Sequence, residues 1–465
     1  MRGIRELEAA ADEAHQRADR VNPGGIDPEH RGVGDNEPWA WPESQLGGVG
    51  VESLQPPSQV GPYSPSRRDD DKSEVGDQAN RSSWEGSDLD AVSCLSAIAC
   101  TAVGSSDYTL AEAWNGKKWR IEPTPRPGQG SSLQDVSCTS ATACTAIGDY
   151  VRITGNEETL AEAWNGKKWV FERTPNPSGA KSSILNGVSC RSATACTAGG
   201  GSGAGVLAES RNGTTWAIKR TPNPAGAKGT GAVYAISCTS ARACIAVGGY
   251  SNGTGAQLAL AEAWNGKSWA IDRTPNPTGT YGSSLSADSC TSLTSCTAVG
   301  NYLDSTRTIV TLAEAWDGTK WVIEPTPNPA GATFGSFLDG VSCTSVSACT
   351  AVGYYVASDE DEVTLAEAWN GKKWVIEPTS NPTGGSSLSA VSCTSATECT
   401  AVGADIAGTL AEAWNGATWV IEPTPNPTGG SSLSAVSCTS ATACTAVGSD
   451  TNSVGTILTL TERYS

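Results

Sequence analysis

Cysteine pairs are the most regular chemical feature of this sequence. Eight pairs recur, and the two members of each are six positions apart: Cys94 and Cys100, Cys138 and Cys144, Cys190 and Cys196, Cys238 and Cys244, Cys290 and Cys296, Cys343 and Cys349, Cys393 and Cys399, and Cys438 and Cys444. A zinc site needs closer pairs and further Cys or His ligands, but both histidines, His15 and His30, lie outside the repeats. A catalytic thiol needs a neighbouring base, and the repeats offer none. We therefore expect neither a metal nor a cofactor.

A disulfide within each hairpin is the interpretation that this spacing favours. If Cys438 lies opposite Cys444, then Val436 lies opposite Ala446 and residues 439–443 form the turn. Opposed residues of antiparallel strands lie about 4.5–5.5 Å apart, which a disulfide can bridge. Buried free thiols are the alternative. Because disulfides form in oxidising compartments, we expect an extracellular or cell-surface protein, although no signal peptide is visible in this chain.

Tryptophans come in pairs around an Asn-Gly or Asp-Gly step. The first member of each pair is Trp114, Trp164, Trp264, Trp316, Trp369 or Trp414. Beside Asn, an exposed aromatic ring of this kind suits a sugar-binding lectin, and the alternative is that it covers the turn. Arg211 takes this place in one unit, and because an Arg is costly in a closed core, we expect the position to be partly exposed. The second tryptophan, such as Trp119, occurs in all seven full units and is expected to pack in the core.

Carboxylates do not form a recognisable catalytic pair. One glutamate recurs in every unit: Glu112, Glu162, Glu209, Glu262, Glu314, Glu367, Glu412 and Glu462. A catalytic pair is normally unique, so eight copies predict a structural hydrogen bond to a neighbouring unit or turn. The acidic stretch at 357–362 lacks the fixed spacing of a calcium loop. We therefore expect a protein that is not an enzyme.

The overall composition excludes some partners. The net charge is −18, which argues against nucleic acid and anionic membrane surfaces, since both attract Lys and Arg. No apolar run approaches the about 20 residues of a membrane helix. We expect no transmembrane segment and a monomer whose partner is an unknown protein or glycan.

The elements that hold these residues are short strands. The first cysteines of successive pairs are 44 to 53 residues apart, a period that suits one four-stranded propeller blade. In the unit at 386–427, strand A is LSAVSC, strand B is CTAVG, strand C is TLAEAW and strand D is TWVIEPT. The TPNP stretch that follows must leave the sheet, because Pro lacks a donor. This predicts an all-β chain with a β-propeller of about eight blades, or alternatively seven.

The two ends of the chain differ from the regular repeats. Residues 87–465 hold seven full repeats and one partial repeat, because the last unit stops after a strand C at 459–465. A strand from just before Ser87, with Trp84 as the strand D tryptophan, is one way to complete the last blade. Residues 1–86 cannot bury a core and are expected to be disordered, with a short helix near 4–21.

The turn between strands C and D gives a register. If Asn115 and Gly116 form a two-residue type I′ loop, then Glu112 lies opposite Trp119 and Leu110 opposite Ile121. Leu110, Glu112, Trp114, Trp119 and Ile121 then share one face of the blade.

The combined pattern SCTSATACTAVG, LAEAWNGKKWVIEPTPNP resembles the tandem repeats of exported bacterial proteins, which are mostly uncharacterised and are interpreted as β-propellers. The resemblance covers residues 87–465. The strand C to strand D hairpin is also similar to the Asp-box of sialidase-like propellers, but a Trp stands where that motif has its Asp. The resemblance therefore implies a propeller fold and export, and no catalytic residue is carried over.

The connections whose length varies predict a binding rim. Strand direction places the A–B and C–D turns, which are constant in length, on one rim, and the variable B–C and D–A connections on the other. The latter include 149–158, 249–258, 301–310 and 354–363, with Tyr150, Tyr250, Tyr302, Tyr354 and Tyr355. Diverse loops on a constant scaffold typically bind ligands. We expect a non-catalytic binding or adhesion module; a multivalent lectin using the first tryptophans is the alternative, and a glycoside hydrolase or lyase a more remote one.

Overall fold

The computed structural model describes residues 86–464, except 225, 228–230, 359–360, 383 and 426–429. All of these residues belong to one compact unit, residues 72–465. The predicted disorder of the N-terminal segment, its helix near 4–21 and the suggested role of Trp84 lie outside the described residues.

The described residues form 31 strands in eight successive blades. The first four blades are β1(Asp88–Ser96), β2(Ala99–Ser105), β3(Thr109–Trp114), β4(Trp119–Ile121); β5(Gly130–Ser140), β6(Ala143–Val151), β7(Glu157–Trp164), β8(Trp169–Glu172); β9(Ser183–Ser192), β10(Ala195–Ser202), β11(Gly205–Asn212), β12(Thr215–Ile218); and β13(Gly231–Ser240), β14(Ala243–Ser251), β15(Gln257–Trp264), β16(Trp269–Asp272). The last four are β17(Gly282–Ser292), β18(Ser295–Leu303), β19(Ile309–Trp316), β20(Trp321–Glu324); β21(Gly335–Ser345), β22(Ala348–Val356), β23(Glu362–Trp369), β24(Trp374–Glu377); β25(Ser386–Ser395), β26(Glu398–Asp405), β27(Gly408–Trp414), β28(Trp419–Ile421); and β29(Ser431–Ser440), β30(Ala443–Thr451), β31(Ile457–Tyr464).

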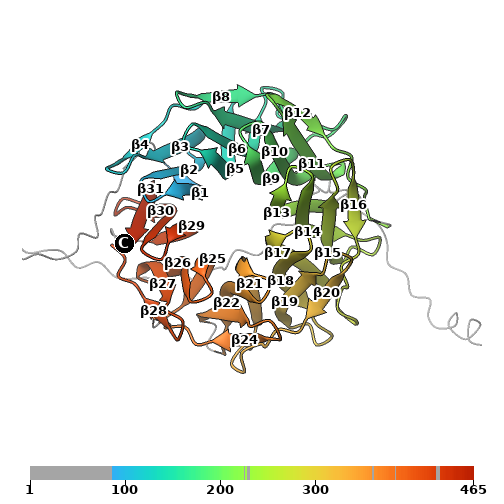
Figure 1. Ribbon diagram of the computed structural model, residues 1–465, viewed down its shortest axis with the longest axis vertical. Helices are drawn as coiled ribbons and strands as arrows, with labels where there is room; N and C mark the ends of the chain where they lie inside the picture. Colours follow the sequence, from blue (N-terminus) through green and yellow to red (C-terminus); the bar gives the residue numbers. More distant parts are fainter. Residues whose placement is uncertain are drawn as a thin grey trace, which may run out of the picture. The chain divides into compact units, whose positions relative to one another are not determined.

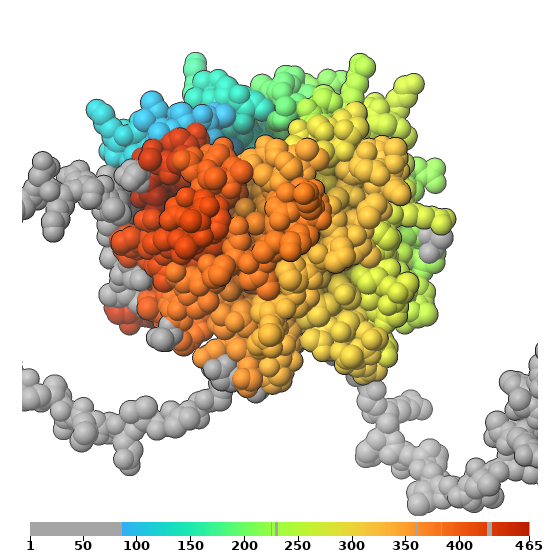
Figure 2. All heavy atoms as spheres, turned by 60° about the horizontal axis from the view of Figure 1, so that its bottom comes forward, coloured from blue at the N-terminus to red at the C-terminus, as the bar shows by residue number. Residues whose placement is uncertain are grey.

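The blades form a closed ring. In each blade the strands pair antiparallel in chain order, A to B to C to D, and the eighth blade has strands A to C among the described residues. The A strands surround the centre and the D strands lie outside (Figure 1). Strand β1 contacts β29, β30 and β31, and the last blades lie beside the first (Figure 2). The predicted all-β propeller of eight blades is therefore confirmed.

The A–B hairpin follows the predicted register. Cys438 pairs with Cys444 and Val436 with Ala446, and the chain turns at 441–442 beside a bulge that leaves Thr439 unpaired. A second bulge falls between Leu433 and Ala435, across from Gly448. A Cβ at Gly448 would lie 2.0 Å from the carbonyl oxygen of Ser432. The glycine that ends each CTAVG motif is thus required by the close approach of strand A.

The eight cysteine pairs all form disulfides within their own hairpins. The bridges are Cys94–Cys100, Cys138–Cys144, Cys190–Cys196, Cys238–Cys244, Cys290–Cys296, Cys343–Cys349, Cys393–Cys399 and Cys438–Cys444. The two Cα atoms of a bridge lie 3.9 to 4.0 Å apart. The disulfide interpretation is confirmed, and the alternative of free thiols is excluded for these residues.

The hydrophobic core lies between blades rather than inside them. Each interface joins small residues of strands A to C of one blade to the larger side chains of the next. Between blades 1 and 2, for example, Ala91, Val103 and Ala111 pack against Leu133 and Trp169. The large leucine of strand A, such as Leu133, is fully buried. Large side chains against small ones are how such stacked sheets interdigitate.

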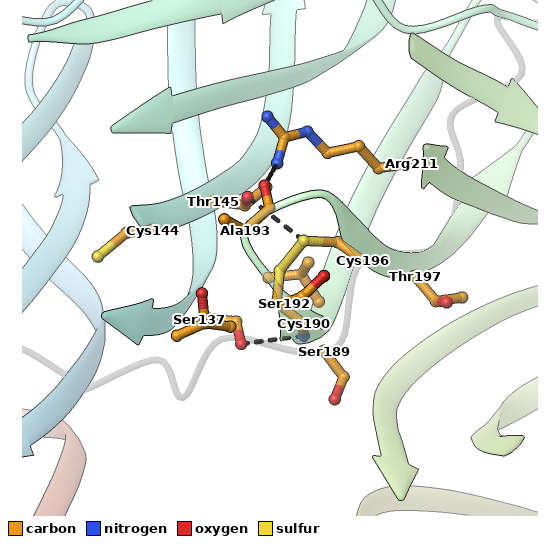
Figure 3. The surroundings of a disulfide bond; sticks show 12 residues. Ser137, Cys144, Thr145, Ser189, Cys190, Ser192, Ala193, Cys196, Thr197 and Arg211 are labelled. Atoms are coloured by element: carbon orange, nitrogen blue, oxygen red, sulfur yellow. Dashed lines mark hydrogen bonds between the residues drawn. A yellow bond between two sulfur atoms is a disulfide. The ribbon is translucent and has the colours of Figure 1, made fainter. Parts of the chain in front are cut away.

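Hydrogen bonds to the preceding blade surround seven of the eight disulfides, and Figure 3 shows one of these. The Ser137 hydroxyl of blade 2 accepts a bond from the Cys190 amide of blade 3, at 3.1 Å. Cys196 Sγ contacts Thr145 Oγ1 of blade 2 at 3.4 Å. A Ser–Cys bond of the first kind and a Thr–Cys contact of the second each recur at seven interfaces, including the one between blades 8 and 1.

The predicted register of the C–D hairpin was wrong by two residues. Trp114 pairs with Trp119 and Glu112 with Ile121, so the loop has four residues. The cause is the Asn115 side chain, whose Oδ1 accepts the Lys117 and Lys118 amides and so closes a longer turn. A shift of two residues preserves the faces of a strand, so the predicted grouping of Glu112, Trp114, Trp119 and Ile121 stands.

The TPNP segment leaves the sheet as predicted, and its side chains replace the lost backbone bonds. After blade 2, the Thr174 hydroxyl donates to the Thr159 carbonyl at 2.6 Å, and Asn176 Oδ1 accepts the Thr159 amide at 3.0 Å. The threonine bond recurs in all seven blades that have a described strand D. This arrangement fixes where each D–A link begins.

Candidate binding surfaces on the two rims

The ring has two rims of different construction. We call the rim made by the A–B and C–D turns the turn rim, and the rim made by the B–C connections and D–A links the hairpin rim. On the turn rim the two turns of a blade contact each other: the Trp114 indole donates to the Ala97 carbonyl at 3.2 Å. A Cβ at Gly116 would lie 3.0 Å from the Ile98 side chain.

The four long B–C connections are extended hairpins rather than loops. Tyr150 pairs with Glu158 and Tyr355 with Val363, so strands B and C continue past the edge of the short blades. These four connections and the one in blade 8 end in the same five-residue turn. The first residue of the turn donates its amide to the carbonyl of the fifth, as Arg152 does to Asn156 at 2.8 Å. The expectation of structurally diverse loops is therefore corrected: the paired strands absorb most of the length difference.

Apolar side chains stand exposed at the tips of the hairpin rim. Ile153 and Val454 are each 82% exposed and Ile406 is 72% exposed. On the D–A links, Phe334 and Tyr281 are exposed at 53% and 50%. These side chains come from five different segments around the ring. Single exposed apolar residues are common on protein surfaces, and the turn rim also carries three, Ile98, Leu293 and Val346.

The tyrosines proposed for binding are partly buried in the blade interfaces. Tyr150, Tyr250, Tyr302 and Tyr355 occupy equivalent positions and each packs against an inter-blade cluster. Tyr150 also donates to Glu158 at 2.8 Å. Tyr354 points away from this set and stacks on Phe337 with ring centroids 4.8 Å apart. The structure does not bring the five rings into one site, and their role in binding stays a prediction.

The first tryptophans lie on the turn rim and cover the turns. Trp114 and Trp264 are buried, whereas Trp164, Trp316, Trp369 and Trp414 are partly exposed. Each ring lies 5.7 to 6.0 Å from the strand D tryptophan of its own blade. In four blades the indole also donates to the A–B turn. Sugar stacking on these rings stays a prediction.

Arg211 was expected to be partly exposed, and this expectation was wrong. Its side chain is buried and forms an ion pair with Glu172 of the preceding blade at 2.5 Å. It also donates to the Ala193 carbonyl of its own A–B turn (Figure 3). Glu172 accepts a further bond from Trp216 at 2.8 Å. A buried Arg is tolerated when it is fully paired, and the sequence offered no means to identify this partner.

The recurring glutamates of strand C form a buried ring. Seven of them have no exposed surface and the eighth, Glu462, is 2% exposed. The predicted hydrogen bond to a neighbouring blade is confirmed at four interfaces, where the first Thr of strand C donates to the next glutamate, as Thr109 does to Glu162 at 3.1 Å. Burial raises the pKa of Glu162, Glu209 and Glu314 to about 8. These groups are therefore protonated at neutral pH.

Aspartates on the innermost strands were not singled out from the sequence. Burial raises the pKa of Asp90 and Asp288 to about 7 and of Asp135 and Asp339 to about 6. The Asp135 carboxylate also accepts the Val136 and Val188 amides, each at 2.7 Å, which opposes this shift. Their signal in the sequence is an acidic residue within the otherwise apolar and Ser-rich strand A. They lie on strand A of blades 1, 2, 5 and 6.

Within the described part of the chain, no group of three or more His, Cys, Asp or Glu side chains could hold a metal ion. The same residues include no helix long and apolar enough to span a bilayer.

Comparisons with known proteins give distant likenesses in fold. No family model and no curated protein matches this chain. Among solved structures, the WD40 β-propeller domain of Doa1 is 11% identical, covers 84% of this chain and 97% of its own, and has a TM-score of 0.44. A polysaccharide lyase, the PL25 ulvan lyase, is 9% identical over 75% of this chain and 97% of its own, with a TM-score of 0.47. The SapL1 lectin in complex with alpha methyl fucoside is 13% identical over 75% of this chain and 98% of its own, with a TM-score of 0.37. These likenesses are too distant to carry an argument about function.

Proposed function

We propose that this chain is a non-catalytic binding or adhesion propeller that acts outside the cell or at its surface, as a monomer, with a protein or glycan bound on the hairpin rim. The observation that carries the proposal is the difference between the rims. The turns of one rim keep a constant length, whereas the B–C hairpins of the other differ in length from blade to blade and end in tips with different side chains, such as Ile153 and Val454. A constant scaffold below varied tips is the usual construction of a binding surface.

The disulfides support the proposed location. Sixteen cysteines in eight local bridges are typical of proteins that fold in an oxidising compartment. The resemblance to exported bacterial repeat proteins points to the same location. Protein purified from its native compartment with sixteen free thiols would contradict this part of the proposal.

The test compares tip substitutions on the two rims. Beads coated with the protein are applied to intact cells of the producing organism and to a glycan array. We expect replacement of Ile153, Phe334, Ile406 and Val454 by Ser to lower bead binding at least tenfold with the melting temperature unchanged. The matched control replaces three exposed apolar residues of the turn rim, Ile98, Leu293 and Val346, and should leave binding intact. Loss of binding in the control alone would place the partner on the turn rim.

A multivalent lectin is the second candidate, because four of the first tryptophans are partly exposed on the turn rim. Replacement of Trp164, Trp316, Trp369 and Trp414 by Phe, which keeps the packing area, would abolish glycan-array signals if this candidate is correct. A hydrolase or lyase would instead release product from aryl glycosides or a uronate polysaccharide. Turnover of either substrate would contradict the non-catalytic proposal.

A further inference from the structure

A cavity of about 460 Å³ opens on the hairpin rim of blade 4. Tyr250, Leu260 and Ile271 line it, together with Pro224 of the link from blade 3. Strands B and C of blade 3 already end at the pair Ser202–Gly205, so this blade is short beside Tyr250, which stays partly exposed. The volume falls within the range of about 300–1,000 Å³ that is usual for small-molecule sites.

The polar lining of this cavity contains one free cation. Arg273 is exposed and forms no ion pair or hydrogen bond with the described residues. Thr274 donates its hydroxyl to a strand C carbonyl at 2.9 Å, and Asn276 Oδ1 accepts a strand C amide at 3.1 Å. Asp272 pairs with Ala261, whose side chain packs against blade 5, so the Asp272 carboxylate is directed toward that blade. The Arg273 guanidinium is therefore the main charged group that faces a ligand.

Blade 2 contains the same tyrosine and arginine with a carboxylate already beside them. Tyr150 and Arg173 stand there at the positions of Tyr250 and Arg273. The Glu158 carboxylate accepts the Tyr150 hydroxyl at 2.8 Å. Although burial raises the pKa of Glu158, the hydrogen bonds that this group accepts and the charge of Arg173 hold it below its usual value. A tyrosine and an arginine at these two positions therefore favour a bound carboxylate.

Blade 4 has no glutamate at the corresponding place. Leu258 stands opposite Tyr250 where blade 2 has its glutamate, and the Tyr250 hydroxyl has no partner among the described residues. Ile271 replaces Phe171, whose ring meets the blade 2 tyrosine edge-on with centroids 6.0 Å apart. The smaller side chain leaves room where the phenyl ring packs in blade 2. Blade 4 thus presents the same two groups beside a cavity instead of beside an acid.

The surroundings of the cavity are basic in an otherwise acidic chain. Residues 183–281, which form blades 3 and 4, carry eight Lys and Arg against three Asp and Glu, whereas the whole chain has a net charge of −18. Two of the three acids, Glu209 and Glu262, are fully buried. Lys219 takes the strand D position that holds Glu or Asp in the other six blades with a described strand D. Positive charge concentrated in this way attracts polyanions.

Arginines continue from the cavity along the outer edge of the ring. Arg173, Arg220 and Arg273 take one position after strand D in blades 2, 3 and 4, where the four other blades with a described strand D have Pro. All three are exposed, and the strands that precede them, β8, β12 and β16, follow one another on the outside of the ring (Figure 1). A polymer with repeated acidic groups can contact more than one of these arginines, so the row favours a polymer over a single small acid.

We propose that the hairpin rim of blades 3 and 4 binds an acidic polysaccharide, with one uronate residue in the cavity of blade 4. The uronate carboxylate pairs with Arg273 and accepts the Tyr250 hydroxyl, and the C–H face of the sugar ring packs on Leu260 and Ile271. An acidic peptide fits less well, because Thr274 and Asn276 are already bonded to strand C and would leave its backbone groups without partners. This inference rests on the proposed function, of which it names the partner.

The probes are tri-α-1,4-D-galacturonate, its trimethyl ester and tetraglutamate, each titrated into the full-length protein. Binding is measured by saturation-transfer difference NMR. For trigalacturonate we expect a dissociation constant on the order of 1 mM, as befits one charge-assisted pair in an open site. The ester should bind at least fivefold more weakly, because it has no carboxylate for Arg273.

Two pairs of variants locate the site. Leu258→Glu supplies the carboxylate that blade 2 contains and should abolish trigalacturonate binding, whereas Leu258→Gln, of the same size and without charge, should keep the affinity within twofold. Arg273→Gln should weaken binding at least fivefold. Its matched control, Arg173→Gln in blade 2, should change the affinity less than twofold, because that arginine already lies near a glutamate. Melting temperatures within about 2 °C of the parent would show that the variants fold.

Three results would overturn the proposal. The first is an absence of signal with the parent protein at 10 mM trigalacturonate, and the second is an equal effect of the two variants in either pair. The third is tighter binding of tetraglutamate than of trigalacturonate, which would make the cavity a peptide site. None of the four tip substitutions of the bead assay lies on blades 3 or 4, so that assay tests the proposed function independently of this cavity.

Discussion

At the scale of single residues, the buried glutamates link stability to pH. Glu162, Glu209, Glu262, Glu314 and Glu367 have a pKa raised by burial from 4.5 to about 8, and Glu412 to about 7. The folded protein therefore holds protons that the unfolded chain releases above pH 4.5. Such a group contributes its full stability below pH 4.5 and loses it as pH rises through the folded pKa.

The first prediction is that the protein becomes less stable between pH 5 and pH 8. Each glutamate in this range lowers the free energy of unfolding by about 1.4 kcal/mol per pH unit. The midpoint of urea unfolding, measured at pH 5, 6.5 and 8, should fall steadily. Glu314→Gln, which keeps the shape and cannot ionise, should make the fall shallower by about one group. A midpoint that rises over this interval would contradict the assignment.

A second prediction concerns the hydrogen bond between a strand D carboxylate and the tryptophan of the next blade, which an Asp is one methylene group too short to form. Glu324 of blade 5 accepts the Trp374 indole of blade 6 at 3.0 Å, and Glu377 accepts Trp419 at 3.1 Å. Asp272 stands at the equivalent position of blade 4, and the buried Trp321 nitrogen of blade 5 has no partner among the described residues. Asp272→Glu should form this bond and stabilise the fold by about 1 kcal/mol.

The matched control for this prediction is Glu324→Asp, which shortens a side chain that does reach its tryptophan. It should destabilise the protein by about 1–3 kcal/mol, because the Trp374 nitrogen would be buried without a partner. The measurement is the denaturant midpoint of each variant at pH 6, compared with that of the parent protein. Changes of the same sign in both would show that chain length at this position does not control the bond.

At the scale of the element, the A–B hairpin is a unit held by its own disulfide. Replacing both members of one pair, such as Cys393 and Cys399, by Ala should cost about 2 kcal/mol, the chain-entropy value for so small a loop. Because the backbone pairs on either side of the missing disulfide remain, the blade should still form, and the circular dichroism spectrum should be unchanged. Peptide mass mapping of the parent under non-reducing conditions should recover eight local bridges. Any bridge between different blades would contradict this arrangement.

Much of each element was predictable because its causes are local. Strand positions follow from the alternation of small and apolar residues, and the disulfides follow from a six-residue spacing across a hairpin. The C–D register was missed because an Asn115 side chain, rather than the backbone, closes the turn. Arg211 was misplaced for a different reason: its partner, Glu172, is 39 residues away in sequence. The first cause lies within one repeat and is a choice between two turn types, whereas the second is not visible from one repeat alone.

The candidate site was predicted only in outline. The two rims follow from strand direction, which the sequence specifies once the strands are known. The extension of strands B and C beyond the short blades was not predicted, because the length of a connection does not show whether its residues pair, as Tyr150 does with Glu158.

At the scale of the whole molecule, hydrogen bonding between blades is uneven. Between blades 4 and 5, Ile245 replaces the threonine that contacts the next cysteine, and Ala259 replaces the threonine that bonds the next glutamate. Both carboxylate oxygens of Glu314 are buried without a partner in the described structure, as are those of Glu262 at the interface of blades 3 and 4. Ser237 contacts the Asp288 carbonyl instead of accepting a cysteine amide. Unpaired buried groups are costly, so this interface should be the weakest in the ring.

This unevenness predicts where the ring opens first. Hydrogen exchange at low denaturant should show the strand A and B amides of blades 4 and 5 exchanging with the lowest opening free energy of any blade pair. The double variant Ala259→Thr and Asp272→Glu restores two of the recurring bonds and should bring their protection up to that of blades 5 and 6. If blades 8 and 1 exchange first in both proteins, the chain ends rather than the bonding pattern control opening.

The position of this interface matters because it lies across the ring from the place where the first and last described strands, β1 and β31, meet (Figure 1). Blades 8 and 1 are not consecutive in the sequence, but their interface keeps the recurring Ser–Cys, Thr–Cys and Thr–glutamate contacts, including Ser437 to Cys94 and Thr459 to Glu112. Blades 4 and 5 are joined by the link at 273–281, and Ile245 and Ala259 remove two of the recurring contacts between them. A thermal fluctuation that separates them therefore leaves a tethered arc of eight blades rather than a detached end. Such an arc can reclose at the rate of a short loop. The interface between blades that are not consecutive is therefore held by hydrogen bonds, and the interface with fewer recurring bonds is held by a covalent link.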